Sequence, residues 1–291
     1  MKALVTGGSG FVGRYLASAL REAGWRVATL DCRPPADFVL DLARAPLPRL
    51  DYDAVFHLAG QARPAESMKA PEETYALNAE ATARLARALR SGRFVFASSA
   101  HVYGPGSENS VDESFPTMPP NPYAASKLCA EALARAAWKD TVILRPFNHT
   151  GPGQSDAFVC PRIVRQVARA EAGLAPPVIR VQDLAPRRDL FDVRDMARAY
   201  ILAAERARAG EVYNVASGRA WSVREIAERL RKESRVPLRI EGPSRDASLR
   251  VGDASKFRRD TGWKPLIPME RTLQDMLEYE RRALGGATAS S

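Results

Sequence analysis

The chain has 291 residues, 45% of them hydrophobic and 26% charged, which is enough apolar material for one large domain or two smaller ones. Its formal net charge is +9, but acidic residues lie between the arginines along the whole chain, which argues against a nucleic-acid partner. No apolar run approaches the ~20 residues of a membrane span, the scattered cysteines and histidines indicate no metal site, and the N-terminus lacks the apolar stretch of a signal peptide, so we expect a cytoplasmic protein.

Short apolar runs alternate with longer amphipathic segments through the first half of the chain. The predicted strands are 2–6, 26–31, 38–40, 54–60, 93–99 and 141–147, and the predicted helices are 11–24, 71–92 and 122–138. Such alternation is typical of a doubly wound parallel sheet that helices cover on both faces. We therefore expect an α/β fold of the Rossmann type.

The second half of the chain is less regular and indicates a smaller, interleaved domain. An insert over 103–122 has no period and is rich in Pro, Ser and Asn, as a lid or binding loop often is. The expected division is a dinucleotide-binding domain over 1–147 with a return segment over 189–216, a mainly substrate-binding domain over 148–284, and a tail over 285–291.

A glycine pattern lies between the first predicted strand and the first predicted helix. Gly7, Gly10 and Gly13 form G-x-x-G-x-x-G, which permits a tight turn and lets a pyrophosphate approach the helix N-terminus. Asp31, at the end of the second strand, can accept bonds from both ribose hydroxyls and would repel a 2′-phosphate, so it favours NAD(H). Arg33 suits a 2′-phosphate and keeps NADP(H) open.

Three polar residues form a candidate catalytic set. Ser99 follows the predicted strand 93–99, and Tyr123 and Lys127 lie one turn apart on one face of the next helix. A phenol there can pass a proton to or from a carbonyl oxygen beside a nicotinamide, while the serine holds the same oxygen. We expect the ammonium and the cofactor's positive ring to lower the phenol pKa from its usual ~10. A Tyr-x-x-x-Lys pair without such neighbouring motifs would be interpreted as an incidental pair on the protein surface.

The chain resembles the extended short-chain dehydrogenase/reductases, in particular the sugar-nucleotide epimerase/dehydratase family, from residue 1 to about 282. The motifs that carry the resemblance are TGGSGFVG, FHLAG, SSAHVYG, YAASK, RPFNHTGPGQ, RRDLFDVRDMARAY, EVYNVASG and TGWKP. RPFNHTGPGQSDAFV and TGWKPLIPMERTLQDML look most like GDP-6-deoxy-D-mannose reductases, with GDP-mannose 4,6-dehydratases next. The resemblance implies NAD(P)H-dependent reduction of a 4-keto-6-deoxy sugar nucleotide, most simply a GDP-sugar. It also implies a homodimer that pairs through the helices at about 72–91 and 122–138.

The resemblance also assigns roles to single residues. Catalysis falls to Ser99, Tyr123 and Lys127. The cofactor would meet the glycines with Phe11 and Val12 at the pyrophosphate, Asp41 and Leu42 at the adenine, Leu58, Ala59 and Gly60 from the fourth strand, and Asn78, Tyr123 and Lys127 in the active site. The substrate would meet Ser99, His101, Tyr123, Asn148, Phe158, Val159, Arg188 and Arg245.

Two departures from the family pattern leave alternatives open. Ala100 and His101 stand where the dehydratases carry acidic residues, so an elimination reaction is disfavoured. The reductases also often carry a glutamate at the position of His101, so the match to that activity is imperfect. His101 can be a packing residue or a substrate contact. Arg188 matches the family's nucleotide-phosphate arginine but could instead pair with Asp189 or Asp192. Arg245 is shifted by two positions from the family's second phosphate arginine.

The same residues also fit two other functions. An NAD-dependent sugar-nucleotide 4-epimerase would use the same catalytic set with a cofactor that stays bound. A non-catalytic protein that senses dinucleotides could use the same fold, although such a protein would not need the tyrosine or the lysine.

Overall fold

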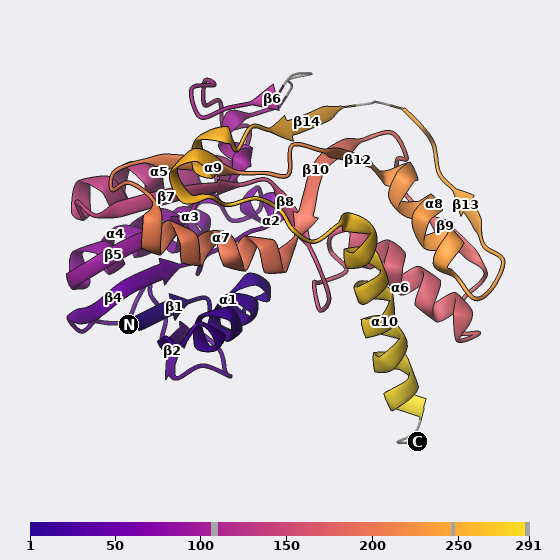
Figure 1. Cartoon of the computed structure of the whole chain (residues 1–291), viewed down its shortest axis with the longest axis horizontal. Helices are drawn as coiled ribbons and strands as arrows, with labels where there is room; N and C mark the ends of the chain where they lie inside the picture. The colour runs from indigo at the N-terminus through magenta and orange to yellow at the C-terminus, as the bar shows by residue number, and fades with distance from the viewer. Residues whose placement is uncertain (106–109, 246–247, 289–291) are drawn as a thin grey trace.

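The computed structural model describes residues 1–105, 110–245 and 248–288, and its largest element is a seven-stranded sheet (Figure 1). The strand order is β11-β7-β5-β4-β1-β2-β3, and all neighbouring pairs are parallel. The strands are β1 Lys2–Thr6, β2 Arg26–Asp31, β3 Phe38–Val39, β4 Leu50–His57, β5 Leu89–Ala97, β7 Thr141–Pro146 and β11 Val212–Val215. This order confirms the predicted doubly wound fold.

Helices cover both faces of this sheet. One face carries α1 (Phe11–Glu22) and α7 (Val193–Arg206). The other carries α3 (Pro71–Tyr75), the π-helical turn η1 (Ala76–Glu80), α4 (Ala81–Ala88) and α5 (Pro122–Ala137), with the short α2 (Pro64–Ser67) beside α5. Successive strand residues point to opposite cores: Val5 and Phe56 pack with α1 and α7, whereas Leu4 and Val55 pack with α4 and α5. Both faces are therefore buried, which explains why the strands are almost wholly apolar.

Some predicted boundaries differ by several residues, and the strand expected over 54–60 spans Leu50–His57 instead. The helix expected over 71–92 ends at Ala88, and β5 begins at Leu89, which pairs with Leu50 of β4. Gly92 has a φ of +80°, and a Cβ there would lie 2.0 Å from the carbonyl oxygen of Tyr52. Close backbone pairing with β4 therefore overrides the helical pattern.

The second half of the chain builds two smaller sheets and a helical layer. The strands β6 (Ser110–Val111), β8 (Asn148–Thr150), β10 (Arg187–Asp192), β12 (Ala220–Ser222) and β14 (Leu249–Gly252) form one sheet, and β9 (Val178–Arg180) and β13 (Arg239–Glu241) form the other. The helices are α6 (Val159–Glu171), α8 (Val223–Glu233), α9 (Ser255–Thr261) and α10 (Met269–Thr288), and Figure 1 shows α6, α8 and α10 gathered away from the large sheet. These three helices share a separate hydrophobic core.

Two expected segment limits differ from the structure. The return to the large sheet begins with α7 rather than at residue 189, because β10 pairs with β8, β12 and β14. The tail expected over 285–291 is helical as far as Thr288, since Leu284 packs against the helical core and extending an existing helix costs little; residues 289–291 lie outside the described residues.

The insert over 103–122 connects the two parts of the molecule. It begins in the short helix η2 (Ala100–Tyr103) and contains β6, which pairs with β14 of the second sheet; residues 106–109 lie outside the described residues. The insert thus runs from the carboxyl end of β5 to the smaller part. No helix in the described part of the chain is long and apolar enough to cross a bilayer.

Candidate active site

The glycine-rich turn between β1 and α1 is closely packed against the end of β4. Gly7 has a φ of +72°, and a Cβ on it would lie 2.8 Å from the backbone nitrogen of Ala59. A Cβ on Gly13 would lie 2.0 Å from the carbonyl oxygen of Gly7. Only glycine fits these positions, and the turn leaves room for a ligand to approach the backbone closely.

The N-terminus of α1 is suited to an anion. Gly10 is the N-cap residue, no side chain caps the helix, and its first turn carries no acidic residue. The backbone N–H groups of Phe11, Val12 and Gly13 therefore have no partner within the helix, and the helix dipole favours negative charge there. These residues fit the pyrophosphate of a dinucleotide.

Asp31 lies at the edge of the same turn. Its carboxylate accepts a bond from the backbone N–H of Ser9 at 3.1 Å and one from the backbone N–H of Arg33 at 3.3 Å. The Ser9 hydroxyl donates to the carbonyl oxygen of Pro35 at 2.6 Å. The segment after β2 is thus folded against the glycine-rich turn, which holds the carboxylate beside the anion site, where a ribose would adjoin a pyrophosphate.

The two residues expected at the adenine lie after β3. Leu42 is only 6% exposed and belongs to the core beneath α4. One carboxylate oxygen of Asp41 accepts the backbone N–H of Ala43 at 2.9 Å.

The three catalytic candidates meet at the carboxyl end of β5. Ser99 follows that strand, and Tyr123 and Lys127 lie on the first turns of α5; the side chains of all three are buried. The Ser99 hydroxyl lies close enough to the Tyr123 phenol to lower its pKa. The Lys127 ammonium donates to the carbonyl oxygen of Ala97 at 2.8 Å and lies 5.0 Å from the ring centre of Phe96.

The start of α5 is fixed by local sequence. Asn121 is the N-cap residue, and its side-chain oxygen accepts the backbone N–H of Ala124 at 2.9 Å. Pro122 follows at the first helical position, where its missing N–H costs nothing. Tyr123 is therefore held in the first turn, next to Ser99.

Burial dominates the titration of this set. It raises the pKa of Tyr123 above the usual value of about 10, and the hydrogen bond with Ser99 offsets part of the rise. Burial also lowers the pKa of Lys127 to about 8, while the negative charge of Glu131 raises it. The expected lowering of the Tyr123 pKa by the Lys127 ammonium is not found: burial raises this pKa, and the one group that lowers it is Ser99.

Asn78 connects the active-site elements from η1. Its side chain accepts the backbone N–H of Gln61 at 2.8 Å and donates to the hydroxyl of Ser126 at 2.9 Å. A Cβ on Gly60 would lie 2.5 Å from the Asn78 oxygen and 3.6 Å from the Lys127 ammonium. The end of β4, η1 and α5 therefore meet at one point beside the catalytic lysine.

His101 lies between Tyr123 and two arginines. Its ring packs edge-on against the Tyr123 ring with 5.8 Å between centres, and its backbone N–H donates to the Ser99 hydroxyl at 3.2 Å. Burial, together with the positive charges of Arg250 and Arg188, lowers the pKa of His101 to about 4. His101 is therefore neutral near pH 7 and does not act there as an acid.

The remaining substrate candidates are more dispersed. Asn148 donates from its side chain to the carbonyl oxygen of Asp189 at 3.3 Å, which links β8 to β10. Phe158 and Val159, at the start of α6, are 42% and 38% exposed. Arg245 is exposed, and its backbone N–H donates to Asp183 at 3.2 Å.

Arg188 contacts neighbouring backbone. It donates to the carbonyl oxygens of Arg187 and Ser248, each at 2.8 Å. Asp189 and Asp192, the two aspartates considered as partners of Arg188, bind other groups. The Asp189 carboxylate accepts bonds from the 217–218 turn and from Gly252, and the Asp192 carboxylate forms an ion pair with Arg194 at 2.7 Å.

Sequence reasoning missed a buried polar network behind the catalytic helix. Glu131 and Arg145 form an ion pair at 2.7 Å, and Glu131 also accepts a bond from Ser98. Arg145 donates to the Tyr103 hydroxyl at 3.0 Å, and that hydroxyl donates to Asn214 at 2.7 Å. The signal for Glu131 was present, because it follows Lys127 by four residues on the same helix face.

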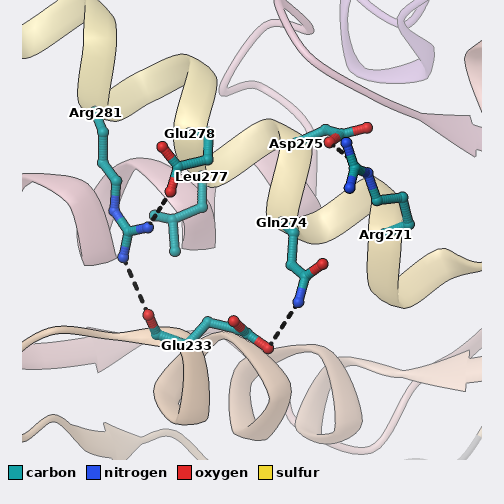
Figure 2. Close-up of a pocket in the computed structure, with 7 residues that line it drawn as sticks. All are labelled: Glu233, Arg271, Gln274, Asp275, Leu277, Glu278 and Arg281. Atoms are coloured by element: carbon teal, nitrogen blue, oxygen red, sulfur yellow. Dashed lines mark hydrogen bonds and ion pairs between the residues drawn. The ribbon is translucent and has the colours of Figure 1, made fainter.

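A hollow of about 240 Å³ lies elsewhere, between the end of α8 and α10 (Figure 2). Its polar residues bond to one another: Arg271 pairs with Asp275 at 2.8 Å, and Gln274 donates to Glu233 at 3.1 Å. None of the residues predicted for cofactor or substrate lines it, so this hollow is separate from the candidate active site.

Comparisons with known proteins agree with this geometry. A profile of the NAD dependent epimerase/dehydratase family matches residues 3–216. The GDP-6-deoxy-D-mannose reductase of Pseudomonas aeruginosa is 38% identical over 296 residues, which cover 96% of this chain and 97% of that protein. The UDP-glucose 4-epimerase of Streptomyces lividans is 32% identical over 312 residues, which cover 91% of each chain.

A solved structure shows the same arrangement. The structure of RMD from Pseudomonas aeruginosa complexed with NADPH matches with a TM-score of 0.88 and 35% identity, over 97% of this chain and 99% of that chain. Together with the glycine-rich turn and the Ser99, Tyr123 and Lys127 set, these matches show that the chain belongs to the NAD-dependent epimerase/dehydratase family.

Proposed function

We propose that this protein reduces a 4-keto-6-deoxy sugar nucleotide with a reduced nicotinamide dinucleotide. The nicotinamide, when bound, supplies the hydride for the keto carbon. Tyr123 gives the proton to the carbonyl oxygen, Ser99 donates a hydrogen bond to that oxygen, and Lys127 holds positive charge beside the phenol. The first residues of α1 hold the pyrophosphate.

The meeting of Ser99, Tyr123 and Lys127 at the carboxyl end of β5 carries this proposal. Burial raises the pKa of Tyr123, which favours a protonated phenol that can donate during reduction. An epimerase would use the same three residues, so the consumption of cofactor distinguishes the two activities. Ala100 and His101 supply no carboxylate for an elimination, which also argues against dehydratase activity.

Similarity supports the choice of substrate. The Pseudomonas aeruginosa relative that spans nearly all of both chains is named a GDP-6-deoxy-D-mannose reductase. We therefore propose a GDP-linked 4-keto-6-deoxyhexose as substrate. The seven-stranded part would bind the dinucleotide, and the smaller part would bind the sugar nucleotide. Two substrate candidates support this division, because Arg188 lies on β10 and Phe158 directly precedes α6.

The test is an assay for cofactor consumption. GDP-4-keto-6-deoxymannose is added together with NADH or NADPH, and the loss of reduced nicotinamide is followed. We expect one equivalent of cofactor to be consumed per sugar, with a higher kcat/KM for NADH because Asp31 would repel a 2′-phosphate. A preference for NADPH, which the similar Pseudomonas structure holds, would mean that Arg33 outweighs Asp31.

A 4-epimerase is the second candidate, because the Streptomyces lividans relative is named a UDP-glucose 4-epimerase. An epimerase would interconvert a sugar nucleotide with no added cofactor and no net change in the nicotinamide. Turnover of that kind, without consumption of NADH or NADPH, would contradict the reductase proposal. Dinucleotide binding without either turnover would indicate a sensing protein.

A further inference from the structure

Arg250, which no sequence motif singled out, lies beside Arg188 in the second sheet. The two residues are direct partners in the parallel pairing of β10 with β14, so their side chains leave the sheet on the same face. The Arg250 guanidinium donates to the carbonyl oxygen of Gly104, which ends η2. Arg250 therefore reaches the helix that starts at Ser99.

The electrostatics of this cluster favour an anion. Burial and the neighbouring Arg188 charge both lower the pKa of Arg250, and the same two arginines lower the pKa of His101. Among residues 1–105, 110–245 and 248–288, no carboxylate forms an ion pair with Arg250. Both effects disfavour the charged form of Arg250, so an anion bound at its guanidinium would stabilise that charge.

The family pattern points to a different arginine. Arg245 stands near the place of the family's second phosphate arginine but is exposed, and its backbone N–H donates to the Asp183 carboxylate. Arg250 lies five residues further along and is within electrostatic range of both Arg188 and His101. The segment therefore offers the site a different guanidinium from the one that the sequence indicates.

We propose that Arg250 binds the diphosphate of the sugar nucleotide together with Arg188, in place of Arg245. This inference rests on the proposed sugar-nucleotide function. Each guanidinium can grip two phosphate oxygens at once, and two adjacent guanidiniums match two adjacent phosphates. His101 is neutral and packs on Tyr123, between the two arginines and the proton donor. The sugar would lie beside His101, with its diphosphate at the arginines and its keto group at Tyr123.

The test is calorimetric binding of free nucleoside phosphates to the full chain. GDP, UDP and dTDP are titrated into the wild type, and the tightest of them is compared with its monophosphate in the variants Arg250→Gln, Arg250→Lys, Arg245→Gln and Arg239→Gln. Arg239 is an exposed arginine of β13 and serves as the matched control. The Kd for NADH is measured in every variant.

We expect Arg250→Gln to weaken diphosphate binding roughly tenfold to a hundredfold, because charge-assisted hydrogen bonds to phosphate are lost. The monophosphate should lose much less, and Arg250→Lys should fall between, since it keeps the charge but not the fork. Arg239→Gln should match the wild type, and NADH binding should be unchanged throughout. In the keto-sugar assay, Arg250→Gln should raise KM more than it lowers kcat.

Several results would overturn the inference. One is an unchanged diphosphate Kd in Arg250→Gln; another is that the loss appears in Arg245→Gln instead. A drop in kcat with intact diphosphate affinity would mean that Arg250 only positions η2 through Gly104. If the wild type bound no nucleoside diphosphate at all, the proposed function itself would fail, which is a different outcome from a failure confined to Arg250.

Discussion

Tyr123 is one of four polar side chains that α5 buries, with Ser126, Lys127 and Glu131. Its motif identifies the residue, but only the structure shows that burial raises its pKa and that Ser99 is its partner. A protonated phenol beside a serine hydroxyl presents two donors to one oxygen. That arrangement suits the stabilisation of an alkoxide that forms as hydride arrives.

We expect Tyr123→Phe to lower kcat on the keto-sugar nucleotide by about 10²–10⁴-fold, because only the transferable proton is removed. The Kd for NADH should stay near that of the wild type. Tyr279→Phe, at an exposed tyrosine of α10, is the matched control and should leave kcat unchanged. Near-normal turnover in Tyr123→Phe would identify another proton donor.

The charge of Lys127 sets a pH limit. Its pKa of about 8 means that the ammonium is present below that pH and is lost above it, so kcat/KM should fall as pH rises through about 8. The Glu131 charge raises the Lys127 pKa, so Glu131→Gln should move the fall to lower pH. Full activity well above pH 9 in the wild type would contradict this role for Lys127.

The Glu131→Gln variant also needs a stability measurement. Replacing one partner leaves Arg145 buried without its carboxylate, a change that typically costs about 3–5 kcal/mol. Thermal unfolding therefore accompanies the pH profile, which is recorded below the midpoint of unfolding. A destabilised variant with an unshifted profile would assign Glu131 a purely structural role.

At the scale of elements, a chain of buried hydrogen bonds holds η1 against the sheet. The Thr6 hydroxyl lies 2.7 Å from one ring nitrogen of His57, and the other ring nitrogen lies 2.9 Å from the Thr82 hydroxyl, which donates to the carbonyl oxygen of Asn78. Burial lowers the pKa of His57 to about 3, so the ring stays neutral. His57 therefore links β1, β4 and α4 to the turn that carries Asn78.

The pairing of elements also explains which parts of the site could be predicted from the sequence and which could not. The glycine turn, Ser99, Tyr123 and Lys127 are local motifs, and strand and helix periodicity places them at one edge of a sheet. Arg250 meets Arg188 only because β14 pairs with β10, and no local pattern encodes a register between segments about 60 residues apart. The π-helical turn at Asn78 likewise lies inside an unbroken helical pattern.

At the scale of the whole molecule, α4 and α5 cover one face of the large sheet, and α5 presents small exposed side chains at Cys129, Ala132 and Ala136. These positions share one face of the helix and would allow two helices to approach closely. We therefore propose a homodimer that pairs through α4 and α5 of each copy.

Light scattering at micromolar concentration tests this prediction, and we expect twice the mass of one chain. Ala132→Glu should yield monomers, because two copies of the new charge would face each other across a two-fold axis. Ala209→Glu, at an exposed position outside these helices, should remain dimeric. A monomeric wild type would exclude the proposed pairing.

The central claim is that hydride passes from added cofactor to the keto carbon of a sugar nucleotide. Its most direct test supplies NADH labelled with deuterium at the transferable position and examines C4 of the product sugar by NMR. The account predicts one deuterium at C4 of each product molecule, and about 10²–10⁴-fold less labelled product when Tyr123→Phe replaces the wild type for the same time. Product that forms without deuterium at C4 would contradict it, because the hydride would then come from a cofactor that never leaves the protein.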